Sequence, residues 1–195
     1  MSIDESTLLN AVRVLQNGGV AAIPTETVYG LVTRWDNESG RERIYHLKHR
    51  PASKLLQMLA ADLPQAYASG KILVTPRLER IAGAFWPGAL TAIVPTVDKS
   101  ATVGLRIPDH PFVQELLRRC GFALAATSAN LSGEPAAINI QDAVRHLDGE
   151  PDLAVDGGVI TVTGGKSSTV VSLLDDTPVI LREGTITLEE IKAVL

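Results

Sequence analysis

Residues 21–31 read AAIPTETVYGL, and this stretch decides how the fold is interpreted. A short apolar run is followed by hydroxyl groups, one carboxylate and a glycine, a pattern typical of a buried strand that delivers polar groups to one end of a sheet. Two later segments have the same build, at residues 124–133 and 164–171. Because ligands of open α/β sheets bind at strand ends, these three hydroxyl-rich segments predict a ligand site.

Apolar spacing along the rest of the chain predicts helices that alternate with strands. Helices are expected at about 5–17, 38–49, 77–85, 110–119 and 141–147, and after Thr187, which forms a capping box with Glu190. Strands are expected at 20–23, 55–60, 90–94, 103–107, 123–126, 169–174 and 178–181, the last two forming a hairpin. With no internal repeat and no Pro/Ser linker, the sequence predicts an α/β protein with one mixed sheet and a single domain over residues 1–195.

The composition excludes several classes of protein. Of the 195 residues, 45% are hydrophobic, which is enough for a substantial core. No apolar run approaches the ~18 residues of a membrane span, and the acidic start MSIDEST is unlike a signal peptide. The lone Cys120 can form no internal disulfide, so we expect a cytoplasmic protein outside the membrane. A net charge of −4 does not indicate general nucleic-acid binding.

Two cations stand at the end of the second predicted helix. Lys48 and Arg50 precede Pro51, which forces the chain out of the helix. A guanidinium can hold two phosphate oxygens while an ammonium neutralises further charge, so the pair would suit a triphosphate. The same cations would also complement the negative end of the helix dipole, and position alone does not choose between these roles. Both side chains are expected to be reachable from solvent.

Two further segments offer hydroxyl and amide groups. Ser128 and Asn130 follow a strand of small residues, where they could donate to phosphate or ribose oxygens, or could equally cap a turn or helix. Ser168 and Thr169 begin a later strand and could bind phosphates, although hydroxyls at strand starts also serve local hydrogen bonds.

In the second half of the opening stretch, residues 25–29, a hydroxyl-bearing side chain occurs at every second position. If it continues as a strand, Thr25, Thr27 and Tyr29 share one face and Glu26 lies on the other. That face could grip a small polar amino acid. The alternative is that Tyr29 is a core aromatic and Glu26 a surface charge.

Two arginines are embedded in apolar runs. Arg106 and Arg182 would be costly to bury unpaired, so each is expected to meet an acid, a carbonyl or an anionic ligand. The simplest partners in the sequence are Asp109 and Glu183. The chain has no GxxxxGK[ST], GxGxxG, GxSxG or HExxH motif, and the GGKSS at residues 164–168 lacks the earlier glycine of a phosphate loop. No acidic metal-binding cluster is visible either.

Seven motifs, taken in order, resemble the YrdC/Sua5 family of threonylcarbamoyl-AMP synthases. They are PTETVYGL (24–31), KxRP (48–51), WPG (86–88), GLRIPDHP around Arg106, SANLSG (128–133), STVV (168–171) and LREG (181–184). The resemblance runs from Val20 to Gly184. It implies a YrdC-like fold, in which a twisted mixed sheet flanked by helices forms a concave ligand cleft. It also implies a nucleotidyltransferase that makes threonylcarbamoyl-AMP and pyrophosphate from L-threonine, bicarbonate and ATP, for N6-threonylcarbamoyladenosine at position 37 of tRNA.

The resemblance also assigns roles to individual residues. It implies a nucleotide site of Lys48, Arg50, Ser128, Asn130, Ser168, Thr169 and Arg182, with Lys48 and Arg50 as the catalytic pair, and a threonine site of Thr25, Thr27, Tyr29 and Arg106. Mg²⁺ is implied as the companion of ATP. The chain resembles the short form of the family, so transfer to tRNA is expected to need tRNA-modification partner proteins.

Two alternatives remain. The concave basic cleft of the family has also been interpreted as an RNA-binding surface, so the chain could be a non-enzymatic RNA-binding protein, or an enzyme that binds RNA weakly. It could also be a divergent YrdC paralogue with another substrate. Three departures allow this: Val32 where the family usually has glycine, His49 where the family has KGRP, and Leu55-Leu56 where it has Pro-Leu.

Overall fold

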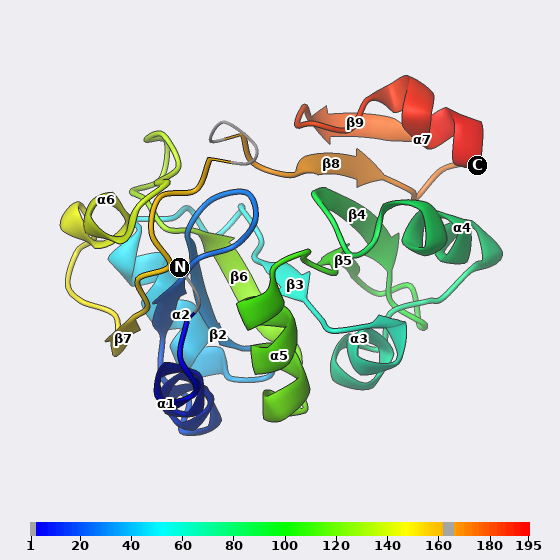
Figure 1. Cartoon of the computed structure of the whole chain (residues 1–195). Helices are drawn as coiled ribbons and strands as arrows, with labels where there is room; N and C mark the ends of the chain where they lie inside the picture. The colour runs from blue at the N-terminus through cyan, green and yellow to red at the C-terminus, as the bar shows by residue number, and fades with distance from the viewer. Residues whose placement is uncertain (1–2, 162–165) are drawn as a thin grey trace.

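The computed structural model describes residues 3–161 and 166–195 (Figure 1). Gly164 and Gly165, from the third hydroxyl-rich segment, lie outside these ranges. Within them, one mixed sheet has the strand order β7-β1-β2-β6-β3-β5-β4-β8-β9. Its strands are β1 (Ala21–Ile23), β2 (Gly30–Arg34), β3 (Gln57–Leu59), β4 (Leu90–Pro95), β5 (Thr102–Arg106), β6 (Leu124–Ser128), β7 (Leu153–Ala154), β8 (Thr169–Ser172) and β9 (Val179–Arg182).

Parallel and antiparallel pairs occur in the same sheet. β1/β7, β3/β5 and β4/β8 are parallel, whereas β1/β2, β2/β6, β3/β6, β4/β5 and β8/β9 are antiparallel. The α/β class with a mixed sheet is therefore confirmed. The predicted hairpin of the last two strands is also present, with a register shift between Val170 and Val171.

Seven helices accompany the sheet in the described ranges. They are α1 (Glu5–Gln16), α2 (Glu38–Leu47), α3 (Leu63–Gly70), α4 (Pro76–Phe85), α5 (Pro111–Cys120), α6 (Ile140–Arg145) and α7 (Leu188–Val194). α1 begins where the Asp4 side chain accepts a hydrogen bond from the Thr7 amide at 2.7 Å. α7 carries the predicted capping box between Thr187 and Glu190.

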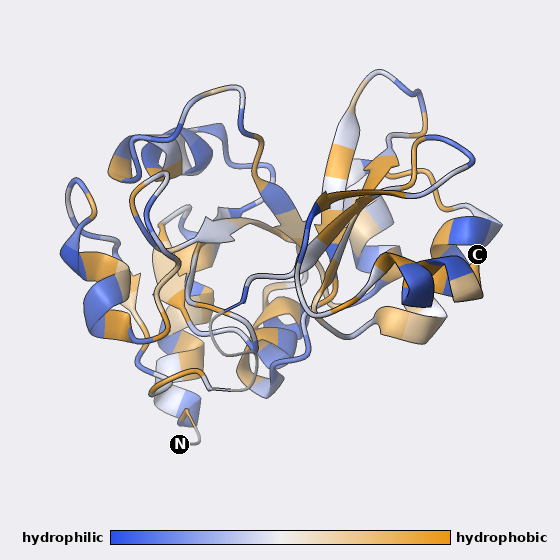
Figure 2. Cartoon of the chain, turned by 90° about the horizontal axis from the view of Figure 1, so that it is seen from above, coloured by the Kyte–Doolittle hydropathy of each residue, from blue (hydrophilic) through white to orange (hydrophobic). Residues whose placement is uncertain are grey.

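Apolar residues fill both faces of the sheet. Figure 2 shows strands that are largely hydrophobic and helices in which hydrophobic and hydrophilic residues alternate. α1 and α5 pack over one face, where Leu15, Val113 and Leu117 are fully buried against Leu124 of β6. α2 covers the other face of the same strands through Ile44, which packs with Leu31 and Ala125.

Three elements were not predicted, and a fourth ends early. β2, α3 and β7 were not predicted, although Asp62 before α3 accepts from the Gln65 amide as an ordinary N-cap. The second helix ends earlier than predicted, at Leu47. His49 then adopts a φ of 47°, in the left-handed region, so Lys48 and Arg50 lie in a loop and not in the helix. None of the helices in the described ranges is long and apolar enough to cross a bilayer.

Candidate functional site

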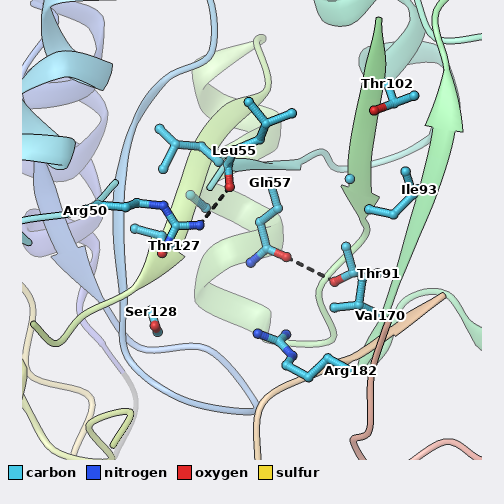
Figure 3. Close-up of a pocket in the computed structure, with 13 residues that line it drawn as sticks. Arg50, Leu55, Gln57, Thr91, Ile93, Thr102, Thr127, Ser128, Val170 and Arg182 are labelled. Atoms are coloured by element: carbon cyan, nitrogen blue, oxygen red, sulfur yellow. Dashed lines mark hydrogen bonds between the residues drawn. The ribbon is translucent and has the colours of Figure 1, made fainter. Parts of the chain in front are cut away.

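A cavity of about 230 Å³ opens against the middle of the sheet (Figure 3). Strands β3, β4, β5, β6 and β8 supply its walls, and two arginines flank it. Its lining residues are Arg50, Leu55, Leu56, Gln57, Thr91, Ile93, Thr102, Gly104, Ala126, Thr127, Ser128, Val170 and Arg182. Three of the residues predicted for a nucleotide site, Arg50, Ser128 and Arg182, therefore meet here from distant parts of the chain.

Arg50 is held by the loop that follows it. Its Nε donates to the main-chain oxygen of Lys54 at 2.9 Å, and its Nη2 donates to that of Leu55 at 2.8 Å. Burial lowers the pKa of Arg50 from its ordinary value, but a guanidinium stays protonated in proteins. The fixed main-chain contacts therefore present a permanent positive charge to the cavity.

Arg182 stands on another side of the same cavity (Figure 3). Its Nε and Nη2 donate to the main-chain oxygen of Ser168 at 3.0 and 2.8 Å, and Nη2 also donates to the Ser168 hydroxyl at 3.0 Å. Burial, and then the charges of Arg106 and Arg50, lower the pKa of Arg182. Neither Arg50 nor Arg182 forms an ion pair with a carboxylate in the described part of the chain, so the two guanidinium groups create a local positive potential that favours an anionic ligand.

Lys48 does not line the cavity, and the expectation that solvent reaches it is wrong. Only 1% of the residue is exposed. Its Nζ donates to the main-chain oxygens of Ser128, at 2.5 Å, and Asn130. Burial, followed by the charge of Arg50, lowers the pKa of Lys48 to about 7, whereas the carbonyl acceptors favour its charged form. The side chain runs beneath residues 128–130 because these oxygens lie there, and it ties that loop to the end of α2.

Asn130 serves the turn in which it lies. Its Nδ2 donates to the main-chain oxygens of Leu131 and Glu134, at 2.7 and 2.8 Å, and its Oδ1 is 3.4 Å from the Lys48 ammonium. The structure thus brings Ser128 to the cavity and uses Asn130 to shape the loop behind it.

The two hydroxyls at the start of β8 point to opposite sides. Ser168 lies 2.8 Å from the Thr91 hydroxyl, next to the cavity. Thr169 is fully buried and exchanges hydrogen bonds with the main chain of Ile186, donating to its oxygen at 2.8 Å and accepting from its amide at 3.1 Å. The alternation of the strand places Val170 in the cavity wall and leaves Thr169 outside it.

The segment from Pro24 to Tyr29 is a bend between β1 and β2, so the predicted continuous strand is wrong. The Thr25 hydroxyl donates to the main-chain oxygen of Val28 at 2.7 Å and lies 3.0 Å from the Thr27 hydroxyl. The Tyr29 hydroxyl donates to the main-chain oxygen of Gly158 at 2.7 Å. Compact turn bonding, and not alternation, therefore sets the directions of these side chains.

Arg106 is paired with Glu26, which is neither on an opposite face nor a surface charge. Its Nη2 lies 2.6 Å from Glu26 Oε1 and 3.1 Å from the Thr27 hydroxyl, and its Nε donates to the main-chain oxygen of Gly88. The Arg106 side chain is 3% exposed and that of Glu26 is 12% exposed. The prediction that Arg106 needs an acid or a carbonyl is confirmed, but Asp109 contributes its amide to Glu26 and not its carboxylate to Arg106.

Gln57, Thr91 and Thr102 line the cavity but were not predicted. Gln57 lies in β3 between apolar neighbours, and Thr91 lies in an otherwise apolar β4. A polar residue within a buried strand is the signal that could have identified them.

The donor set does not fit a metal held by the protein. In the part of the chain that the structure describes, no three His, Cys, Asp or Glu side chains gather closely enough to bind a metal ion. The cavity lining contains hydroxyl, amide and guanidinium groups but no carboxylate.

The three departures from the family pattern lie in different places. Val32 is fully buried in β2 and belongs to the core beneath α1 and α5. His49 occupies a left-handed conformation that favours glycine, and its Nε2 lies 2.8 Å from Asp148 Oδ2. Leu55 and Leu56 line the cavity, with Leu55 mostly exposed.

Comparison with known proteins gives one consistent result. The family model Sua5_yciO_yrdC, described as "Telomere recombination", matches residues 13–184. Two curated relatives are named threonylcarbamoyl-AMP synthase. The one from Bacillus subtilis is 38% identical and aligns with 100% of this chain, and the one from Pyrococcus abyssi is 33% identical and aligns with 99%. The chain spans 58% of the length of each of these relatives.

Solved structures share the fold. P. abyssi Sua5 complexed with L-threonine has a TM-score of 0.90 at 32% identity, covering 100% of this chain and 59% of its own. E. coli YciO has a TM-score of 0.85 at 26% identity, covering 96% of this chain and 94% of its own. The twisted sheet with flanking helices is therefore the fold that the sequence motifs indicated.

Proposed function

The chain belongs to the Sua5/YciO/YrdC family, and from this premise we propose that it is a threonylcarbamoyl-AMP synthase that acts in tRNA modification. The single observation that carries the proposal is the convergence of Arg50, Ser128 and Arg182 on one cavity. The reaction joins L-threonine and bicarbonate into a carbamate with loss of water. A carbamate oxygen then attacks the α-phosphorus of ATP, and pyrophosphate leaves.

In this proposal the guanidinium groups stabilise the negative charge of the phosphates. Arg50 and Arg182 hold phosphate oxygens and offset the charge that gathers on the leaving pyrophosphate. Ser128, the last residue of β6, donates its hydroxyl to the nucleotide, and Lys48 and Asn130 keep the turn that follows it in place. Ser168 supports Arg182 from behind, whereas Thr169 contributes to the fold.

We place the amino acid beside Arg106. Arg106 bonds to Glu26 and to the Thr27 hydroxyl, next to the Thr25 turn, and together they form a polar cluster. This cluster lies near the nucleotide cavity, because the charge of Arg106 contributes to lowering the pKa of Arg182. Tyr29 supports this region by holding the main chain at Gly157 and Gly158. The solved structure of the P. abyssi relative with L-threonine supports the choice of ligand.

No covalent intermediate with the protein is needed, so positioning and charge compensation supply the catalysis. Mg²⁺ is proposed as part of the MgATP substrate, held by phosphate oxygens, because the lining offers no carboxylate. We further propose that partner proteins transfer the threonylcarbamoyl group to tRNA. The chain would act with them in the cytoplasm.

The test uses the purified chain with ATP, labelled bicarbonate and L-threonine. Pyrophosphate and a labelled adenylate should form only when threonine is present. Arg50→Ala should abolish most of this activity, while Lys54→Ala, which removes an exposed cation of the same loop, should retain it. If threonine gives no additional pyrophosphate while RNA binds in a salt-sensitive manner, the RNA-binding alternative replaces the enzyme.

A further inference from the structure

Four polar side chains form a continuous hydrogen-bonded row along one wall of the cavity. Arg182 Nη2 lies 3.0 Å from Ser168 Oγ, which lies 2.8 Å from Thr91 Oγ1, which in turn lies 3.0 Å from Gln57 Oε1. Ser168 and Thr91 are 1% and 2% exposed, so water does not replace their partners. The row ends on Gln57, whose side chain projects into the open space, as does the guanidinium of Arg182 at the other end (Figure 3).

Chemistry fixes the direction of every bond in this row. A guanidinium only donates, so Ser168 accepts from Arg182. The buried Ser168 hydrogen then needs an acceptor, and among the described residues its hydroxyl contacts only Arg182 and Thr91. Ser168 therefore donates to Thr91, and Thr91 passes its own hydrogen to Gln57 Oε1. A reversed amide would leave a buried hydroxyl hydrogen unbonded, which is costly.

The consequence is an amide with one fixed orientation. Gln57 Oε1 is occupied, and Nε2 keeps two hydrogens with no acceptor among the described residues. Figure 3 shows this nitrogen pointing into the cavity, between Arg50 and Arg182. At Gln57 the wall therefore presents hydrogen-bond donors to a ligand.

The cavity surface beside Gln57, formed by Gly104, Ile93 and Val170, has room for a planar group. At Gly104, an added Cβ would lie 3.2 Å from Ile93 Cδ1, 3.5 Å from Thr91 Cγ2 and 3.8 Å from Gln57 Cβ. Because Gly104 has no side chain, nothing protrudes from β5 at this point, and the apolar side chains of Ile93 and Val170 lie on either side of it. A planar ring fits such a surface, while phosphates would face the guanidinium groups.

Resting on the proposed function, we propose that Gln57 recognises the purine base of the nucleotide by donating a hydrogen bond to one of its ring nitrogens. The row from Arg182 through Ser168 and Thr91 holds the amide in the donating orientation. Because Gln57 Oε1 already accepts from Thr91, the group that the amide turns toward the ligand is its NH₂. A ring nitrogen is the acceptor that a purine offers to such a donor.

The test measures binding of ATP and of its 1-deaza, 3-deaza and 7-deaza analogues by calorimetry. The unmodified chain should bind one of the three about 10-fold more weakly than ATP, the effect of one lost hydrogen bond. Gln57→Met should bind ATP about 10-fold more weakly and no longer distinguish that analogue from ATP. Gln16→Met, at an exposed position of α1, is the matched control and should distinguish it as before.

Two further variants test the row itself. Thr91→Val removes the hydroxyl that fixes the amide and should reduce the discrimination, whereas Thr91→Ser should restore it. Thermal unfolding of each variant checks that it is folded. Base recognition by Gln57 is refuted if the unmodified chain binds all three analogues like ATP, or if Gln57→Met still discriminates. A chain that makes threonine-dependent pyrophosphate without discriminating refutes only this inference, whereas a chain that binds no ATP refutes the proposed function as well.

Discussion

The ammonium nitrogen of Lys48 donates to the main-chain oxygen of Ser128 at 2.5 Å. This contact joins the loop after α2 to the end of β6, two segments that are remote in sequence. A second bond to the main-chain oxygen of Asn130 continues the connection. The position of Ser128 at the cavity therefore depends on a buried cation that does not itself line the cavity.

Replacing Lys48 by Met should destabilise the chain by about 1–3 kcal/mol, because two buried carbonyl groups lose their donor. Affinity for ATP should fall as well, since the end of β6 at Ser128 and the turn after it loosen. Urea unfolding and calorimetry measure the two effects. Lys54→Met, in the exposed part of the same loop, should change the free energy of unfolding little. Equal stability of both variants would contradict the buried role.

The same lysine gives the stability a pH dependence. Its pKa of about 7 in the folded chain lies below the ordinary lysine value. Between these two values the unfolded chain binds a proton that the folded chain does not, so raising the pH favours folding. The free energy of unfolding of the unmodified chain, relative to Lys48→Met, should rise from about pH 7 to about pH 9, by at most about 1.4 kcal/mol per pH unit. A difference that stays flat or falls over this range would show that the carbonyl contacts outweigh burial.

Glu26→Ala should be among the most damaging single substitutions. It leaves the guanidinium of Arg106, 3% exposed, without its carboxylate, and breaking a buried ion pair costs about 3–5 kcal/mol. Urea unfolding measures the loss. Glu115→Ala removes the exposed partner of Arg119 and should cost less than about 1 kcal/mol. Comparable losses in the two variants would mean that the buried pair stabilises no more than a surface pair.

Arg182→Ala should weaken ATP binding by at least about 10-fold, since hydrogen bonds to charged groups contribute about 1.5–3 kcal/mol each. Arg182→Lys should not restore it, because a lysine cannot contact both the main chain and the hydroxyl of Ser168 and still face a phosphate. Arg13→Ala, on the exposed side of α1, is the control for lost positive charge. Calorimetry at two salt concentrations would show whether the loss of ATP affinity comes from a direct contact at the cavity or from the lower positive charge of the whole chain. If Arg13→Ala weakens binding as much as Arg182→Ala, the local site is excluded.

Much of the fold could be predicted from local patterns, because each pattern has a local cause. The strands around Leu90–Val94 and Val103–Ile107 are runs of apolar and β-branched residues, and the Thr187–Glu190 capping box lies within four residues. The end of α2 was missed because Lys48 continues the helical pattern in sequence, while His49 interrupts it through its backbone conformation.

The candidate site was predictable in composition but not in contacts. Cations and hydroxyls near strand ends indicated an anion site, and Arg50, Ser128 and Arg182 do meet. The burial of Lys48 and the pairing of Glu26 with Arg106 depend on chain segments about 80 residues apart. Side-chain periodicity describes one element at a time, so such partners are set by the topology of the sheet.

The strand order has a consequence for synthesis on the ribosome. β4 lies between β5 and β8, and its second neighbour is made late in the chain. A nascent chain released from the ribosome only as far as β5 exposes an unpaired edge of β4, where another chain could add a strand. β8 covers that edge, and β9, which pairs with β8, carries Arg182 to the cavity. Protection from aggregation and completion of the cavity therefore both depend on the same late hairpin.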